Sequence, residues 1–133
     1  MRRALCLGLV LAVAASGLLA YRLWASGCCG AGACLCHGAV SNVVDTCDYE
    51  FTVDHSRDCG TDHDVYVYVK EVGEENYTAF LMTLTSLYPY PVCMQYYKKL
   101  TLDENTYYYY YFGCPECDET CCGGGFNTGD CGS

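Results

Sequence analysis

Cys114-Pro-Glu-Cys117 has the Cys-x-x-Cys spacing on which thiol–disulfide oxidoreductases depend. That chemistry needs a thiol whose pKa is lowered, typically at the N-terminus of a helix. Asp118 and Glu119 follow the motif, and their negative charges would raise a thiol pKa instead. We therefore interpret both cysteines as structural half-cystines, and a thiol–disulfide oxidoreductase stays a remote alternative.

Zinc binding is a second chemistry that these residue types can support. Four cysteines lie close together and three histidines are available as further ligands: Cys114, Cys117, Cys121, Cys122, His37, His55 and His63. Thiolate zinc sites belong mainly to reducing compartments, whereas exported cysteines usually pair with one another. We therefore expect disulfides here, with no metal and no cofactor.

Residues 54–64 concentrate four carboxylates and two imidazoles. Oxygen-rich loops with a glycine can bind Ca²⁺, so this acidic loop is a candidate Ca²⁺ site. Its spacing is not that of an EF-hand, because Val65 stands where the glutamate at the twelfth position would be. Ser56 lies beside histidine and aspartate, yet nothing places it on a nucleophile turn. We predict no catalytic residues and no enzymatic activity.

Residues 107–112 form an unbroken aromatic run with five tyrosines: Tyr107, Tyr108, Tyr109, Tyr110 and Tyr111. A strand points successive side chains to opposite faces, so such a run places large rings on both sides of a sheet. One side can cover the domain's own core, and the other needs a second layer or another molecule. Tyrosine combines a large contact area with a hydroxyl group, which is typical of interfaces. The run therefore predicts an interaction surface, with a thick two-sheet core as the alternative.

Alternating side chains predict the strands that would carry these residues. Val65, Val67 and Val69 alternate with polar and aromatic residues, and a turn at residues 73–76 favours a hairpin with residues 77–87. A second hairpin is predicted from residues 93–102 and 107–112 around a polar four-residue loop. Residues 49–53 predict one more strand, which residues 40–44 would pair with. The predicted fold is mostly β, a small disulfide-rich antiparallel sheet or sandwich of about 5–6 strands.

The N-terminal segment has the three parts of a secretory signal. Met1-Arg2-Arg3 is positive, residues 4–20 carry no charge, and Ala25-Ser26-Gly27 offers small residues for cleavage. We expect residues 1–27 to be a signal-peptide helix, and residues 28–133 to be a single cysteine-rich β domain. The protein would then be secreted to the extracellular space without a membrane anchor. A retained anchor is the alternative.

Twelve cysteines would remain after the signal, an even number that predicts up to six disulfides: Cys28, Cys29, Cys34, Cys36, Cys47, Cys59, Cys93, Cys114, Cys117, Cys121, Cys122 and Cys131. The formal net charge of −9 would become −12, because Arg2, Arg3 and Arg22 leave with the signal. So acidic a surface repels phosphate backbones, which excludes nucleic acid as a partner. Asn76-Tyr77-Thr78 is an N-glycosylation sequon at the predicted hairpin turn, so Asn76 is a candidate glycan site.

The ten cysteines from Cys34 onward end with the pair Cys121-Cys122 and a last cysteine, Cys131. This pattern resembles the three-finger fold of snake toxins, in which hairpins extend from a cysteine-rich base. It departs from that family at Cys34 and Cys36, which one residue separates in place of two. The resemblance implies a monomeric module that presents loops to a receptor.

These observations lead to a non-catalytic secreted structural protein as the first hypothesis. In it, a disulfide-stapled subunit self-associates through its tyrosine-rich strands into an extracellular filament, coat or matrix. The alternative is a monomeric secreted or cell-surface binding module, three-finger-like or otherwise, that recognises a protein ligand or receptor.

Overall fold

A computed structural model describes residues 28–30, 32–87 and 93–131, and the predicted signal peptide lies outside them. The described part is mostly β, as predicted. Its strands are β1 (Leu35–Asn42), β2 (Asp48–Ser56), β3 (Tyr66–Glu71), β4 (Thr78–Leu81), β5 (Thr83–Leu87), β6 (Cys93–Thr101), β7 (Tyr107–Cys114) and β8 (Glu119–Asn127). Two short 3-10 helices connect strands, η1 (Arg57–Cys59) and η2 (Pro115–Cys117).

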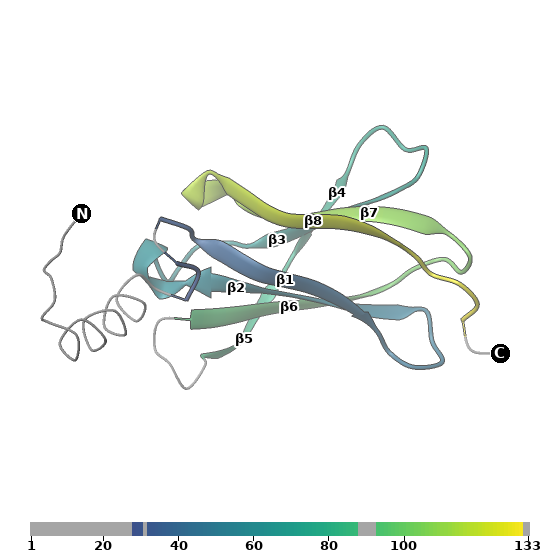
Figure 1. The fold of residues 1–133 in the computed structure, drawn as a ribbon, viewed down its shortest axis with the longest axis horizontal. Coiled ribbons are helices and arrows are strands. Elements are labelled where there is room, and N and C mark those ends of the chain that lie inside the picture. The colour runs from purple at the N-terminus through teal and green to yellow at the C-terminus, as the bar shows by residue number, and fades with distance from the viewer. Residues whose placement is uncertain (1–27, 31, 88–92, 132–133) are drawn as a thin grey trace, which may run out of the picture.

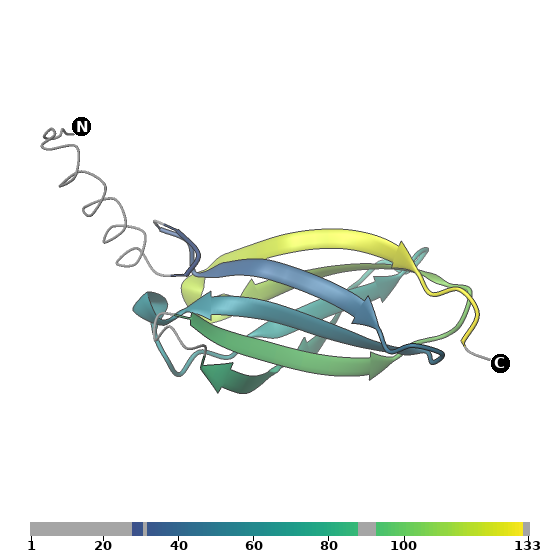
Figure 2. The same ribbon diagram turned by 60° about the horizontal axis from the view of Figure 1, so that its bottom comes forward.

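The strands form two antiparallel sheets of four that lie face to face (Figures 1 and 2). One sheet has the order β1-β2-β6-β5 and the other has the order β4-β3-β7-β8. Lettered along the chain as A, B, C, C′, D, E, F and G, these are the sheets ABED and C′CFG of an immunoglobulin-type sandwich. The likeness is one of topology, which assigns no function by itself. It replaces the three-finger arrangement that the cysteine pattern implies.

Alternating side chains fill the space between the sheets. In β3, Val67 and Val69 are buried while Tyr66 and Tyr68 point outward, as their period of two predicts. The fully buried core side chains come from both sheets and include Phe51, Val53, Val65, Val67, Met94 and Phe112. Each such side chain contributes about 1.5–3 kcal/mol through removal of apolar area from water.

The first predicted hairpin is confirmed only in its first half. β3 and β4 pair through the turn, with Tyr66 opposite Leu81 and Val69 opposite Thr78. The remaining predicted partner residues form β5, which belongs to the other sheet and pairs with β6. Met82, between the two strands, is buried and its backbone N–H donates a hydrogen bond to the Val65 carbonyl at 2.8 Å.

The second predicted hairpin is wrong, because β6 and β7 lie in different sheets. β6 pairs with β2 and β5, and β7 pairs with β3 and β8. A polar loop of four residues suits a crossover between sheets as well as a hairpin turn. The Tyr108 hydroxyl accepts a hydrogen bond from the Asp103 backbone N–H at 3.1 Å, the tyrosine corner typical of this E–F connection.

Within the described ranges, four disulfides join eight of the twelve cysteines. Cys29–Cys36 and Cys34–Cys59 lie where β1 begins and β2 ends, Cys47–Cys131 joins the turn between β1 and β2 to the segment after β8, and Cys121–Cys122 links neighbours in β8. The sequence predicts up to six disulfides among twelve cysteines, but four of these cysteines are free thiols in the structure: Cys28, Cys93, Cys114 and Cys117. Cys93 is buried at the start of β6, and the last two thiols face histidines.

Candidate functional site

The tyrosine run occupies β7, an inner strand between β3 and β8. Tyr108 points into the core and is 7% exposed, whereas Tyr107 and Tyr109 are each 38% exposed on the outer side. Tyr110 packs inward, and its ring centroid lies 5.8 Å from that of Phe51 in β2. In immunoglobulin domains a disulfide joins the strands that correspond to β2 and β7, and its second cysteine lies two residues after the corner tyrosine. Tyr110 occupies that position in this chain, where its contact with Phe51 replaces the disulfide.

The outer side of this sheet is a continuous aromatic surface, which we call the tyrosine face. It consists of Tyr66, Tyr68, Lys70, Tyr77, Ala79, Leu81, Tyr107, Tyr109 and Tyr111. Lys70 carries its single formal charge. An exposed apolar and aromatic patch on a soluble domain typically marks an interaction site.

Ring contacts hold the tyrosine face in a defined arrangement. The rings of Tyr68 and Tyr111 stack with centroids 4.7 Å apart, and Tyr77 meets the Tyr111 ring edge-on at 4.8 Å. The Lys70 ammonium lies 5.2 Å from the Tyr77 centroid and 5.9 Å from the Tyr109 centroid. These aromatic and cation–π contacts restrict the side chains before any partner arrives, which lowers the entropy cost of binding.

Strand β8 lies beside the tyrosine run and is absent from the strands predicted from the sequence. Its Gly-Gly-Gly stretch leaves room for the neighbouring rings, since a Cβ at Gly125 would lie 2.5 Å from the Tyr107 hydroxyl. A Cβ at Gly124 would likewise approach the Tyr110 hydroxyl to 3.1 Å. The glycines read as a loop in isolation, and the adjacent run of large rings was the signal that could have identified a strand.

A pocket of about 330 Å³ opens where the tyrosine face meets the end of β7. The residues that line it include Tyr68, Gly113, Asp118 and Glu119. Both oxygens of the Glu119 carboxylate accept hydrogen bonds from Cys34 N–H at 3.0 Å, and one also accepts from Leu35 N–H at 2.9 Å. Glu119 therefore connects β8 to β1, while Asp118 is exposed.

Asn76 lies in the exposed turn between β3 and β4, directly before Tyr77 of the tyrosine face. Its glycosylation stays a prediction. A glycan at this position would border the aromatic surface, because the sequon itself contributes one of its rings.

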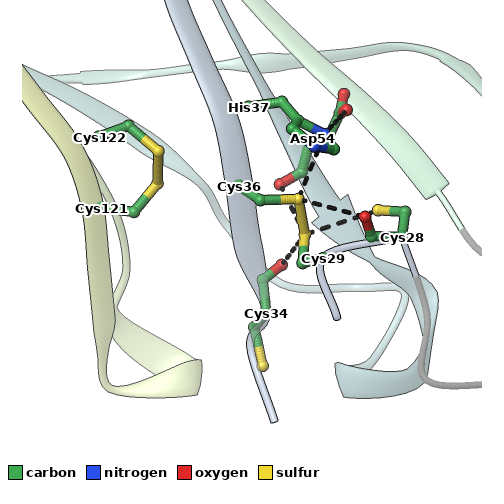
Figure 3. A network of polar contacts seen from close by, with 8 residues as sticks. All are labelled: Cys28, Cys29, Cys34, Cys36, His37, Asp54, Cys121 and Cys122. Carbon is green, nitrogen blue, oxygen red and sulfur yellow. Dashed lines mark hydrogen bonds and ion pairs between the residues drawn. A yellow bond between two sulfur atoms is a disulfide. The ribbon is translucent and has the colours of Figure 1, made fainter. Parts of the chain in front are cut away.

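The carboxylates of the acidic loop do not gather into an oxygen cage among the described residues. Asp54 is buried in β2 and accepts from His37 Nδ1 at 2.9 Å (Figure 3). Asp58, Asp62 and Asp64 are exposed. The groups of potential metal ligands in the described part hold one carboxylate at most, so the structure offers no support for the predicted Ca²⁺ site.

Two of those ligand groups contain a cysteine that is already bonded. Figure 3 shows the Cys29–Cys36 disulfide beside Cys28 and the His37–Asp54 pair. A sulfur in a disulfide is no thiolate ligand, so neither group offers three donors. The third group has all its donors free.

This third group, which we call the His–Cys cluster, consists of His55, His63, Cys114 and Cys117. His55 comes from β2, His63 from the loop before β3, Cys114 from the end of β7 and Cys117 from η2. The Cys114 thiol donates to the Cys117 sulfur at 2.8 Å. These residues are among the zinc candidates predicted from the sequence, but the prediction grouped the cysteines with Cys121 and Cys122, which the structure joins to each other.

The electrostatics of the cluster do not suit a redox thiol. Burial raises the pKa of Cys117 to about 12, and its hydrogen bond with Cys114 adds to that effect. Burial also lowers the pKa of His55, so a positive imidazolium that would stabilise a thiolate is disfavoured. η2 has three residues and supplies no helix N-terminus of useful length.

No protein-family model and no curated protein matches the chain. Among the described residues no helix is long and apolar enough to span a membrane. The disulfides are compatible with an extracellular location.

Proposed function

We propose that the protein is a secreted, non-catalytic structural subunit whose tyrosine face binds the same face of a second copy. The observation that carries this proposal is the contrast between the face and the rest of the chain. The face holds six tyrosines and one charge, which is positive, on a protein whose net charge is −9. The rest of the chain then carries a net charge of −10, so contact between two copies through other surfaces has to overcome like-charge repulsion.

The positions of Lys70 and Asp118 support a second copy as the occupant. On β3, Lys70 and Tyr66 lie two residues to either side of Tyr68. The pocket lined by Asp118 and Glu119 adjoins the end of the tyrosine face where Tyr66 pairs with Gly113. A two-fold axis over Tyr68, in the plane of the contact, would therefore place each Lys70 over the partner's Tyr66, at the end of the face that adjoins the pocket and its exposed Asp118. Such self-complementarity is what an isologous interface requires.

The size of the face sets the expected affinity. Four strands of four, six, eight and nine residues, with about 3.4 Å per residue and about 4.8 Å between strands, give a flat area of about 440 Å² per subunit. This is below the roughly 800 Å² per partner of a standard interface, so we expect a dissociation constant in the micromolar range. A two-fold contact closes at the dimer, and growth into a filament, coat or matrix would use a second surface.

Charge reversal tests the proposal in protein produced from the full-length sequence. Sedimentation equilibrium should show a monomer–dimer equilibrium that Lys70→Glu and Asp118→Lys each weaken about tenfold, because each places like charges opposite one another. The double variant Lys70→Glu/Asp118→Lys should restore dimerisation, since the pair is exchanged on both subunits. Lys99→Glu, an exposed site on the other sheet, makes the same charge change and should leave the equilibrium unaltered.

A monomer at every concentration and salt condition would overturn the proposal and favour the heterotypic binding module. A double variant as weak as the two single variants would also overturn the two-fold arrangement. Asp118 has a left-handed backbone conformation, φ 51°, so circular dichroism must first show that its lysine variant is folded.

A further inference from the structure

We propose that the His–Cys cluster is a tetrahedral binding site for Zn²⁺, formed between the two sheets. It offers two imidazole nitrogens and two sulfurs, the donor set of a closed structural zinc site. The proposal is independent of the tyrosine face, because the two sites share no residue.

The distances between the donor atoms fit one central ion. Zinc bonds of about 2.3 Å to sulfur and about 2.0–2.1 Å to nitrogen place neighbouring S and N ligands about 3.5 Å apart in a tetrahedron. His55 Nε2 lies 3.7 Å from Cys114 Sγ and 3.4 Å from Cys117 Sγ. His63 Nδ1 lies 3.7 Å and 3.1 Å from the same two sulfurs.

A Cys114–Cys117 disulfide is the competing arrangement. The sulfurs are 2.8 Å apart, between the ~2.05 Å of a disulfide and the ~3.8 Å expected across a zinc ion. The positions of the two histidines favour zinc over a disulfide, because a disulfide needs no imidazole ligands. Each of the two rings directs a nitrogen to within 3.7 Å of both sulfurs, from segments more than fifty residues away in sequence.

The surroundings hold both imidazoles in place. His55 is completely buried, and its other ring nitrogen, Nδ1, has no hydrogen-bond partner among the described residues. A metal bond at Nε2 would leave Nδ1 as it is, so what fixes the orientation of this ring is its complete burial. The His63 ring packs on Gly60, where a Cβ would lie 2.7 Å from it, and the His63 carbonyl accepts from the Tyr96 hydroxyl at 3.3 Å.

The cluster lies between β2 and β7, so a bound metal would connect the two sheets. Cys29–Cys36 and Cys34–Cys59 lie at this end but connect only β1, the segment before it and η1. Cys47–Cys131 joins the sheets at the opposite end. A zinc ion would therefore link β2 to β7 at the end where no described disulfide crosses between the sheets, joining the same strand pair that a disulfide joins in immunoglobulin domains.

Metal analysis of protein produced from the full-length sequence tests the proposal. We expect one zinc ion per chain after dialysis, lost on treatment with a chelator, and Cys114 and Cys117 alkylated only after that treatment. Restoring Zn²⁺ to 100 times its dissociation constant should raise Tm by ~10–20 °C. Cobalt substitution should give the visible absorption of a tetrahedral ion with thiolate ligands.

The variants use His63 and Cys117, which are partly exposed, so that folding survives better than at the buried ligands. His63→Gln and Cys117→Ser should lose the zinc, while His37→Gln and Cys28→Ser should keep it, as these residues lie outside the cluster. Peptide mapping that finds a Cys114–Cys117 disulfide in wild type purified with Zn²⁺ and without a chelator would overturn the proposal. Equal zinc content in all four variants would also overturn it. If the cluster variants do not fold, the wild-type cobalt spectrum decides, and its absence counts against the site.

Discussion

Replacement of Tyr108 in β7 by phenylalanine removes the hydroxyl that is hydrogen-bonded to the connection between β6 and β7, where the chain crosses between the sheets. The Asp103 N–H then loses its acceptor at 3.1 Å, while the ring and its packing stay in place. Asp103 is itself exposed, so water can partly replace the hydroxyl, and the loss is that of a net hydrogen bond, about 0.5–1.5 kcal/mol. For a domain of this size that loss lowers Tm by about 4–8 °C per kcal/mol.

Thermal unfolding by circular dichroism, with the disulfides intact, measures the shift. Tyr107→Phe is the matched control, because it removes a hydroxyl from the exposed side of the same strand and should change stability by less than about 0.5 kcal/mol. Amide hydrogen exchange adds a local measurement, in which the Asp103 N–H is protected in the wild type and exchanges faster in Tyr108→Phe. Equal melting temperatures and unchanged exchange at Asp103 would refute the role given to the tyrosine corner.

Two further predictions concern packing and alkaline pH. Gly38→Ala should destabilise the fold by about 1–3 kcal/mol in urea unfolding, because its Cβ would lie 2.5 Å from the Cys122 Cβ and 2.7 Å from the Phe112 ring. Gly123→Ala, whose Cβ would lie 3.3 Å from its nearest neighbour, should lower the free energy of unfolding by less. A larger loss for Gly123→Ala than for Gly38→Ala would contradict this packing. Burial raises the pKa of Tyr68, Tyr96 and Tyr108, so the folded state holds these protons more tightly than the unfolded state. Stability should therefore be complete below the unfolded tyrosine pKa of about 10 and fall as pH rises through the folded values, and Tm constant through this range would exclude the effect.

The sequence predicted those elements whose evidence is local. The alternation of Val65, Val67 and Val69 identifies β3 and which of its sides is buried. The pairing of β1 with β2 also follows from short-range pattern. The β6–β7 hairpin failed because a turn sequence at residues 103–106 does not tell whether the chain returns to the same sheet or crosses to the other.

The candidate sites were predictable to different degrees. The aromatic run at residues 107–112 indicates rings on both sides of a strand from its own composition. The His–Cys cluster depends on residues that are 51 and more positions apart, such as His63 and Cys114. Only the topology brings these together, so spacing along the chain identified the ligand types without their grouping.

The disulfide connectivity also determines how the molecule would respond to tension. A force applied between Cys29 and Cys131 passes through Cys36 and Cys47 by way of their bridges, so the covalent load path contains only residues 36–47. That segment includes most of β1, which is already extended, and it can lengthen to no more than about 37 Å. The rest of the sandwich lies outside this covalent path, so a chain of such subunits linked at these ends would have little covalent slack to extend until its bridges are reduced.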